Sequence, residues 1–352
     1  MNLQLRKRIL LAILEKMGGS LSAIQMQKYL FLYVKLGGEK IYDFVPYRYG
    51  CFSFQANKDI VALASDGYVN VEGQGRDVRY GLSTFCGMYG TLDMFDKEVI
   101  SNLHREFGRM TQDELIAYTY KRWPFTAINS VIKEELLDDE SLEKVRLQKV
   151  RYERQDSVLF TIGYEGFSLE AFLRQLISND VRVLCDVRKN AISRKYGFSK
   201  STLQKACLGV GIDYVHVPEL GIDSRLRQSL SCQDDYDMLF DHYEKTTLLN
   251  GGNHLDHVRG LLSSEKRVCL MCFEKDPRQC HRTRIAVALM SRPDVEYKFT
   301  QEKYNCAIKN TGTSLVVQWL GPHFPPLGAA ESSFPGRGTN IPQAAQCSQN
   351  FF

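Results

Sequence analysis

The sequence lacks the features that would place it in a membrane or in the secretory pathway. No apolar run reaches the ~18 residues that a membrane-spanning helix needs. The first residues combine basic and apolar side chains, but charged residues interrupt the apolar ones and no small-residue cleavage site follows. They therefore predict an amphipathic helix rather than a signal peptide. We expect a protein without a membrane partner that resides in the cytoplasm.

The motifs of three large enzyme classes are also missing. The chain has no GxGxxG after the first predicted strand of its central region, no Walker A sequence and no GxSxG. The first motif binds dinucleotides, the second binds nucleoside triphosphates, and the third positions the nucleophile of α/β-hydrolases. A dehydrogenase, a P-loop ATPase and an α/β-hydrolase are thus all disfavoured.

Cysteine content and charge constrain the class of protein less strongly. Ten cysteines are scattered over 352 residues, a chain too large to be a disulfide scaffold, so most should be free thiols in a reducing compartment. The net charge is only +4, but the first 80 residues hold 11 Lys and Arg against 7 Asp and Glu. This mild basic excess points toward nucleic acid or a nucleotide as the partner.

The chain is long enough for two domains, and the first is predicted over residues 1–90. Helical patterns end at Gly18-Gly19 and at Gly67, and a second helix between them should be capped by Ser20. Two alternating segments then flank a turn at residues 73–75 and predict a β-hairpin. Three helices followed by a hairpin indicate a winged-helix-like domain, a variant of the helix-turn-helix.

The rest of the chain divides into three regions. Residues 91–156 are helical and increasingly charged, which predicts a connector. Residues 157–295 alternate apolar strands with helices, which predicts a Rossmann-like α/β domain with a parallel sheet. Residues 296–352 are predicted to be a disordered tail, because from Thr313 onward they contain two charged residues and five of the ten prolines. Part of this tail resembles the translation of a short interspersed repeat of mammalian genomes, and we assign it no function.

Polar residues follow each of the four strands predicted in the α/β domain. Because ligands of parallel α/β sheets bind beyond the carboxyl ends of the strands, these residues predict a shared pocket. Glu165 and Asp186, on strands expected to be neighbours, are candidate catalytic carboxylates; an ion pair of Asp186 with a nearby arginine is the alternative. Cys280 is a third candidate, because a helix starting at Pro277 would lower its thiol pKa. The predicted ligand-binding residues are Tyr164, Arg188, Ser193, Arg194, Lys195, Cys272, Glu274, His281 and Arg282.

Three interpretations of the segment from Cys272 to Arg282 stay open. The two cysteines can pack as small apolar residues while Arg282 caps a carboxylate. The helix start and the nearby basic residues can instead bind an anion or phosphate. A metal or redox site is the third interpretation, but Cys-x7-Cys-His is not zinc-finger spacing, and neighbouring residues on a helix point about 100° apart. No metal is therefore predicted, and the cofactor is unknown.

These motifs resemble the family called domain of unknown function 488. TIGYEG at 161–166, DVR at 186–188, SRKYGFSK at 193–200 and CFEKDPRQCHR at 272–282 follow the order of the family. YRYGCFSF and YKRWPFTAINS resemble the winged-helix region that is fused to this domain in a bacterial subset. Ala191 and Cys51 depart from the family pattern, which has proline at both positions. The resemblance implies a compact Rossmann-like domain with the same strand-end residues as its site, and it implies no established activity.

The sequence favours an enzyme that acts on nucleic acid, a nucleotide or another phosphate-bearing ligand. The cations of the pocket would bind phosphate, and its two carboxylates would handle protons or water. One alternative is a non-enzymatic, winged-helix DNA-binding regulator whose α/β domain senses an anion. Another is a protein-interaction module, because the segment YDFVPYRYGCFSF is aromatic rather than basic.

Overall fold

The structure is a computed structural model that describes residues 3–84, 86–227, 230–290, 299–302, 305–308 and 316–320. Contacts group residues 1–321 into one compact unit, and residues 322–352 lie outside the described part. Within the described part, none of the helices combines the length and the apolar character needed to cross a membrane.

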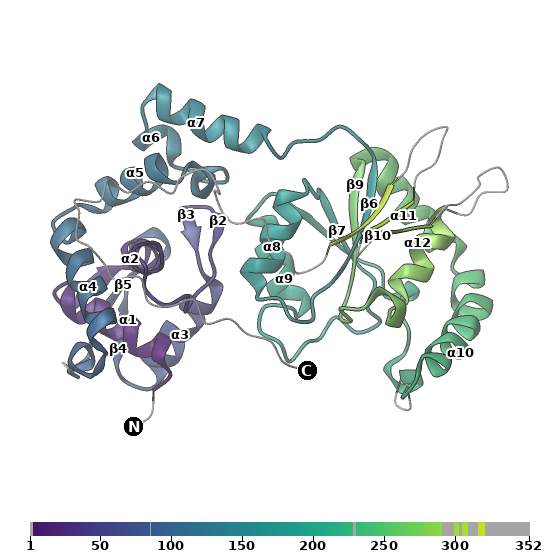
Figure 1. Ribbon diagram of the computed structural model, residues 1–352, viewed down its shortest axis with the longest axis horizontal. Helices are drawn as coiled ribbons and strands as arrows, with labels where there is room; N and C mark the ends of the chain where they lie inside the picture. Colours follow the sequence, from purple (N-terminus) through teal and green to yellow (C-terminus); the bar gives the residue numbers. More distant parts are fainter. Residues whose placement is uncertain are drawn as a thin grey trace, which may run out of the picture. The chain divides into compact units, whose positions relative to one another are not determined.

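Residues 3–84 form three helices, a small three-stranded sheet and a separate hairpin (Figure 1). The elements are α1 (Leu5–Lys16), β1 (Ser20–Ser22), α2 (Ala23–Lys35), β2 (Val45–Tyr47), β3 (Gly50–Phe52), α3 (Phe54–Ser65), β4 (Val69–Glu72) and β5 (Arg79–Leu82). β5 pairs with both β1 and β4, and β2 pairs with β3. The cap predicted for the second helix is wrong. Ser20 lies in β1, whereas Ser22 caps α2 in a capping box with Gln25.

The region predicted as a connector contains α4 (Met94–Phe107), α5 (Gln112–Arg122), α6 (Lys133–Leu136) and α7 (Asp139–Val150). Its first half belongs to the core of the preceding residues, because α4 and α5 add apolar side chains to that cluster. These side chains are Val99, Ile100, Leu103, Phe107 and Leu115. The charged helix α7 buries only Ser141 and Val145, so most of its surface faces solvent.

The remaining part of the chain contains a five-stranded parallel sheet. Its strands are β6 (Val158–Gly163), β7 (Val183–Asp186), β8 (Asp213–His216), β9 (Arg267–Cys272) and β12 (Val316–Leu320), in the order β12-β6-β9-β7-β8. The four predicted strands are present, and β6, β7 and β9 are buried along their whole length. β9 lies between β6 and β7, so the expectation that these two strands are neighbours is wrong.

Helices cover both faces of this sheet (Figure 1). α8 (Leu169–Ser178) and α9 (Lys200–Leu208) pack on one face. α10 (Gln233–Tyr243), α11 (Gly252–Glu265) and α12 (Arg282–Met290) pack on the other. α11 was not predicted from the sequence; it begins at Gly252, directly after Gly251. Glycine is typical of the end of a helix rather than of its start, so Gly251 and Gly252 do not indicate that a helix begins here.

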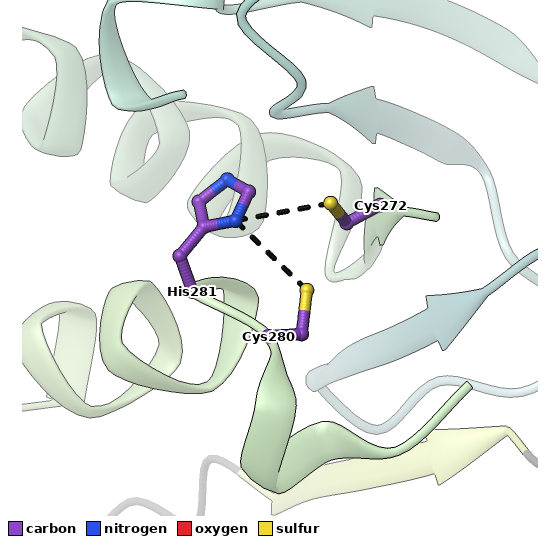
Figure 2. Close-up of side chains that lie close together, drawn as sticks. All are labelled: Cys272, Cys280 and His281. Atoms are coloured by element: carbon purple, nitrogen blue, oxygen red, sulfur yellow. Dashed lines mark hydrogen bonds between the residues drawn. The ribbon is translucent and has the colours of Figure 1, made fainter. Parts of the chain in front are cut away.

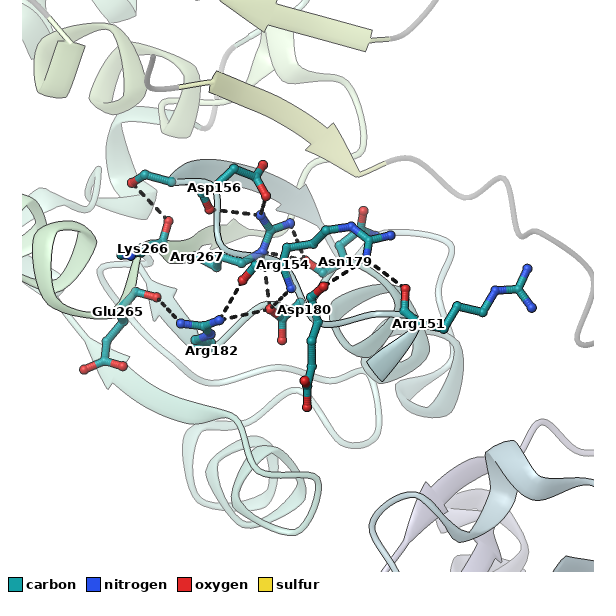
Figure 3. Close-up of polar contacts among 11 residues, drawn as sticks. Arg151, Arg154, Asp156, Asn179, Asp180, Arg182, Glu265, Lys266 and Arg267 are labelled. Carbon is teal, nitrogen blue, oxygen red and sulfur yellow. Dashed lines mark hydrogen bonds and ion pairs between the residues drawn. The ribbon is translucent and has the colours of Figure 1, made fainter. Parts of the chain in front are cut away.

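A polar cluster fixes the amino ends of the strands (Figure 3). Arg267, the first residue of β9, is buried; it donates to the carbonyl oxygen of Asn179 at 2.8 Å and to the carboxylate of Asp156 at 2.9 Å. Arg182 donates to the carboxylate of Asp180 at 3.2 Å and to the carbonyl oxygen of Arg154 at 2.8 Å. Both guanidinium groups are therefore engaged in joining loops at this edge.

Three segments of the tail predicted to be disordered are strands. β10 (Phe299–Glu302) pairs with β11 (Asn305–Ile308), and β12 adds to the sheet beside β6. Pairing with an open sheet edge uses backbone groups and needs no sustained side-chain pattern, so a segment without such a pattern can form a strand there. The other residues of the predicted tail lie outside the described part of the chain.

Candidate functional site

The carboxyl ends of four strands meet at one edge of the parallel sheet. The register aligns Gly163 of β6 with Cys272 of β9, and Asp186 of β7 with His216 of β8. A side chain at Gly163 would collide with the loop after β9, since a Cβ there would lie 1.8 Å from the carbonyl oxygen of Glu274. Glycine therefore allows this loop to close over the strand ends.

Two thiols, an imidazole and a carboxylate converge at the end of β9, and Figure 2 shows the thiols and the imidazole pointing toward one another. Nδ1 of His281 lies 3.8 Å from Sγ of Cys272 and 3.9 Å from Sγ of Cys280. Oε2 of Glu274 lies 3.0 Å from each sulfur. The cysteines and the histidine are buried, whereas Glu274 is half-buried. We call these four residues the Cys-His-Glu cluster.

The backbone before α12 explains this convergence, which the sequence analysis argued against. Asp276 caps a single 3-10 turn over Pro277–Gln279, and Cys280 is extended with φ −133° and ψ 133°. α12 begins only at Arg282. The prediction of a helix from Pro277 onward is therefore wrong, and so is the expectation that the side chains of residues 280 and 281 diverge.

The lowered thiol pKa belongs to Cys272 and not to Cys280. Burial opposes ionisation of Cys272, but its hydrogen bond with Cys280 and the charges of Arg227 and Arg282 outweigh burial and lower its pKa to about 7. Burial, followed by the hydrogen bond and charge of Cys272, raises the pKa of Cys280 to about 12. The helix that was expected to stabilise a thiolate at Cys280 begins two residues later, so it does not act on this thiol as predicted.

Arg227 contacts two members of the cluster, His281 and Glu274. One guanidinium nitrogen lies 2.9 Å from Nδ1 of His281, and another forms an ion pair with Glu274. Nε2 of His281 lies 2.9 Å from the carbonyl oxygen of Val187, which can only accept, so the ring proton resides on Nε2 and Nδ1 accepts from Arg227. Arg227 was not among the predicted site residues, because its loop carries no motif. The available signal was its position in the loop that follows the third predicted strand.

A second buried network surrounds Asp186. Nε and Nη2 of Arg188 donate to its two carboxylate oxygens at 2.8 and 2.6 Å, and the hydroxyl of Tyr214 donates at 2.6 Å. Nη1 of Arg188 donates to the hydroxyl of Tyr164 at 3.0 Å, and that hydroxyl donates to Ser193 at 3.2 Å. Asp186 is fully buried, so the structure shows the ion pair that the sequence analysis left open as the alternative.

The two candidate catalytic carboxylates lie in different environments. Glu165 is exposed, and its Oε2 accepts a hydrogen bond of 2.9 Å from the backbone N–H of Lys275. Asp186 is buried two strands away across the sheet. The structure does not join them as a pair, and Glu165 is the carboxylate that a ligand in solvent can reach.

The four cations predicted to bind phosphate also separate into two groups. Arg188 is bonded to Asp186, and Arg282 is fully buried and donates to two backbone carbonyl oxygens of the loop after β9 at 2.6 and 3.2 Å. Arg194 is exposed, and the half-buried Lys195 donates to the carbonyl oxygen of residue 164 at 3.2 Å. Arg282 therefore supports the loop and caps no carboxylate, and only the second group faces solvent.

Residues 168–289 match the family model described as Domain of unknown function DUF488. The match covers about a third of the chain and begins after the TIGYEG motif. It includes the Cys-His-Glu cluster and the network around Asp186 except for Tyr164. No curated protein matches the chain. The α/β part of the molecule thus matches the DUF488 model, and the description of that family names no activity.

Proposed function

We propose that the carboxyl edge of the parallel sheet is the active site of an enzyme whose substrate carries phosphate, as a nucleotide or a nucleic acid. The observation that carries this proposal is the exposed positive charge on two loops of this edge, those after β7 and β9. Lys189, Arg194 and Lys275 are exposed, and each lacks an ion-pair partner among the residues that the structure describes. Phosphate oxygens are the ligands that such unpaired cations favour.

Glu165 is the residue proposed to handle protons at this edge. Its carboxylate is held by the backbone N–H of Lys275, one of the exposed cations, so an anion bound there would lie beside it. A carboxylate in this position can take a proton from an attacking water molecule. Asp186 and Arg188 are assigned a positioning role, because their network fixes the hydroxyl of Tyr164 beneath the edge.

The first 90 residues are proposed to dock nucleic acid as a winged helix. The order of three helices and a three-stranded sheet, with β4 and β5 forming the terminal hairpin, supports this proposal. The hairpin exposes Arg76 and Arg79, which would lie against the phosphate backbone. A loss of nucleic-acid binding in Arg76→Ala/Arg79→Ala, with nucleotide binding retained, is the expected result.

The main experiment compares binding and turnover in matched variants of the full chain. Fluorescence anisotropy with labelled single- and double-stranded DNA and RNA should show binding that weakens with salt. The slope of affinity against salt should decrease in Arg194→Ala/Lys275→Ala. Lys144→Ala/Arg146→Ala removes the same charge from exposed ion pairs of α7 and should bind like the wild type.

Turnover is measured on nucleotides and on the oligonucleotides that bind. Glu165→Gln should abolish product formation while binding is retained, because only the proton acceptor has been removed. Wild-type protein that neither binds nor converts any of these phosphate-bearing compounds would refute the proposal. Undiminished turnover in Glu165→Gln would refute the role of that carboxylate.

A further inference from the structure

We propose that Cys272, Cys280 and His281 bind one divalent transition-metal ion of the zinc type, with Glu274 as the fourth ligand. This site is distinct from the exposed cations that carry the proposed function, and it stands on the geometry of the Cys-His-Glu cluster alone.

The separations of the side-chain atoms fit a single tetrahedral ion. Zinc bonds of ~2.3 Å to sulfur and ~2.0–2.1 Å to nitrogen place tetrahedral S and N ligands about 3.6 Å apart. The two S···N separations in the cluster are 3.8 and 3.9 Å, and the two sulfurs and Nδ1 all lie within 4.8 Å of one another. An ion placed among them would reach all three ligands with movements of a few tenths of an ångström.

The histidine is oriented as a metal-binding histidine requires. Its Nε2–H donates to the carbonyl oxygen of Val187 at 2.9 Å, which fixes the ring and leaves the lone pair of Nδ1 facing the sulfurs. A hydrogen bond from the distal ring nitrogen to a backbone carbonyl is the usual support of a metal-ligating imidazole. The ligands also come from rigid surroundings, since Cys272 ends a fully buried strand and His281 directly precedes α12.

The charges of the cluster favour a cation at its centre. Two thiol sulfurs and a carboxylate oxygen share a buried space, with Oε2 of Glu274 at 3.0 Å from each sulfur. Metal binding would displace the thiol protons and replace two S–H groups by two metal–thiolate bonds. Thiolate and imidazole ligands select zinc and its neighbours over magnesium and calcium.

Arg227 is the residue that must move when the metal binds. Its guanidinium now donates to Nδ1 of His281, the atom that would bind the ion. The side chain is 20% exposed and its Nε has no hydrogen-bond partner among the described residues, so it can swing outward. It can also remain paired with Oε1 of Glu274 while Oε2 binds the metal, as a partner that orients the carboxylate.

Four protein ligands would leave no open position on the ion. Closed sites of this kind hold structure, whereas catalytic zinc sites keep a position for water. The ion is therefore assigned to fixing the loop between Cys272 and α12, which contributes Lys275 to the carboxyl edge.

The test uses the full chain, stripped of metal under reducing conditions and titrated with Co²⁺ and then Zn²⁺. We expect one equivalent of Co²⁺, a tetrahedral d–d spectrum with a thiolate-to-cobalt charge-transfer band, and displacement by Zn²⁺. Cys272→Ser, Cys280→Ser and His281→Ala should each lose the band or the stoichiometry. Cys232→Ser replaces an exposed cysteine outside the cluster and should behave like the wild type.

The wild-type titration tests the proposed metal site even if a cysteine variant fails to fold. Absence of the thiolate band, or binding that survives in a folded Cys272→Ser or Cys280→Ser variant, would overturn the proposal.

Variants of the two residues nearest to the three ligands refine the test. Glu274→Gln should weaken the affinity for Zn²⁺ by about 10- to 100-fold, and an unchanged affinity would refute the assignment of the fourth ligand. Arg227→Ala should keep one equivalent, and its loss would contradict the displacement of Arg227 by the ion. None of these readouts depends on a phosphate-bearing ligand, so either proposal can fail alone.

Discussion

Gly163 leaves room for the backbone of the loop after β9 at the candidate site. This close approach offers the first test at the scale of single residues. In Gly163→Ala the new Cβ would lie 1.8 Å from the carbonyl oxygen of Glu274, a contact with backbone that no rotamer change relieves. We expect the free energy of unfolding to fall by about 3 kcal/mol, the upper end of the range for overpacking, as measured by urea titration. Gly260→Ala, in α11 with no atom within 4 Å, is the control and should be neutral or stabilising. Equal effects of the two substitutions would contradict this contact.

Asp186 and Asp223 provide a matched comparison of a buried and an accessible ion pair. Each carboxylate accepts from an arginine two residues later, but Asp186 is fully buried, whereas 83% of the Arg225 side chain that pairs with Asp223 is exposed. Asp186→Asn leaves a buried guanidinium without its counter-charge and should cost about 3–5 kcal/mol of unfolding free energy. Asp223→Asn should change the urea midpoint little, because solvent screens that pair. The prediction is wrong if Asp186→Asn unfolds at the wild-type urea concentration.

The residues of the site were predictable where they directly follow a strand, and not elsewhere. The polar residues after the strands could be read from the sequence because parallel strands deliver their carboxyl ends to one edge. Arg227 could not, since its loop has no motif and only folding brings it to His281. The ionisation of Cys272 also depends on tertiary contacts with Cys280 and two arginines, which local sequence does not encode.

At the scale of elements, the 3-10 turn before α12 sets the direction of two ligands of the proposed metal site. Asp276 caps this turn by accepting from the backbone N–H of Arg278 at 2.8 Å. Asp276→Ala should cost about 1 kcal/mol of local stability. It should also weaken Zn²⁺ binding, because the turn no longer fixes the direction of the Cys280 side chain toward the proposed metal site. Competition with a chelating dye measures the affinity. Asp256→Ala, which removes an exposed carboxylate from α11, should leave the affinity unchanged and controls for charge.

Element identity was more predictable than element order and boundaries. The apolar runs correctly predicted β6, β7, β8 and β9. Three of these strands, β6, β7 and β9, are buried on both faces and therefore lack the alternation of exposed strands. Their order was not predictable from chain order, since β9 inserts between β6 and β7 only in the folded sheet. The start of α12 was misplaced because Asp276 and Pro277 suit a 3-10 turn as well as a helix.

At the scale of the whole molecule, buried polar groups join residues before 60 to the first helix of the α/β part. Glu170 of α8 accepts hydrogen bonds from Oγ of Ser53 at 3.1 Å and from the backbone N–H of Gln55 at 2.9 Å. Burial, the largest influence, raises the pKa of Glu170 above its ordinary value of 4.5, despite these hydrogen bonds. Folding therefore favours the protonated carboxyl relative to the unfolded chain.

This raised pKa predicts a specific pH dependence of stability. Between pH 4.5 and the raised pKa the folded state binds more protons than the unfolded state, so the contribution of Glu170 to stability is lost as the pH rises through this window. The glutamine in Glu170→Gln cannot titrate. The unfolding free energy of this variant, relative to that of the wild type, should therefore increase as the pH rises. Urea titrations from below pH 4.5 to neutrality measure the difference, and a difference independent of pH would refute the prediction. Glu143→Gln, on α7, is the control and should show the opposite sign, because Arg146 lowers the pKa of Glu143.

The pairing of β12 with β6 covers an edge of the parallel sheet that would otherwise be open. Val316–Leu320 align with residues 158–162 through main-chain groups, which any sequence without proline supplies. In a variant lacking residues 316–320, the apolar strand β6 would become an edge strand with unpaired backbone groups. Such a variant should form dimers or larger aggregates, with β6 recruiting a strand from a second molecule.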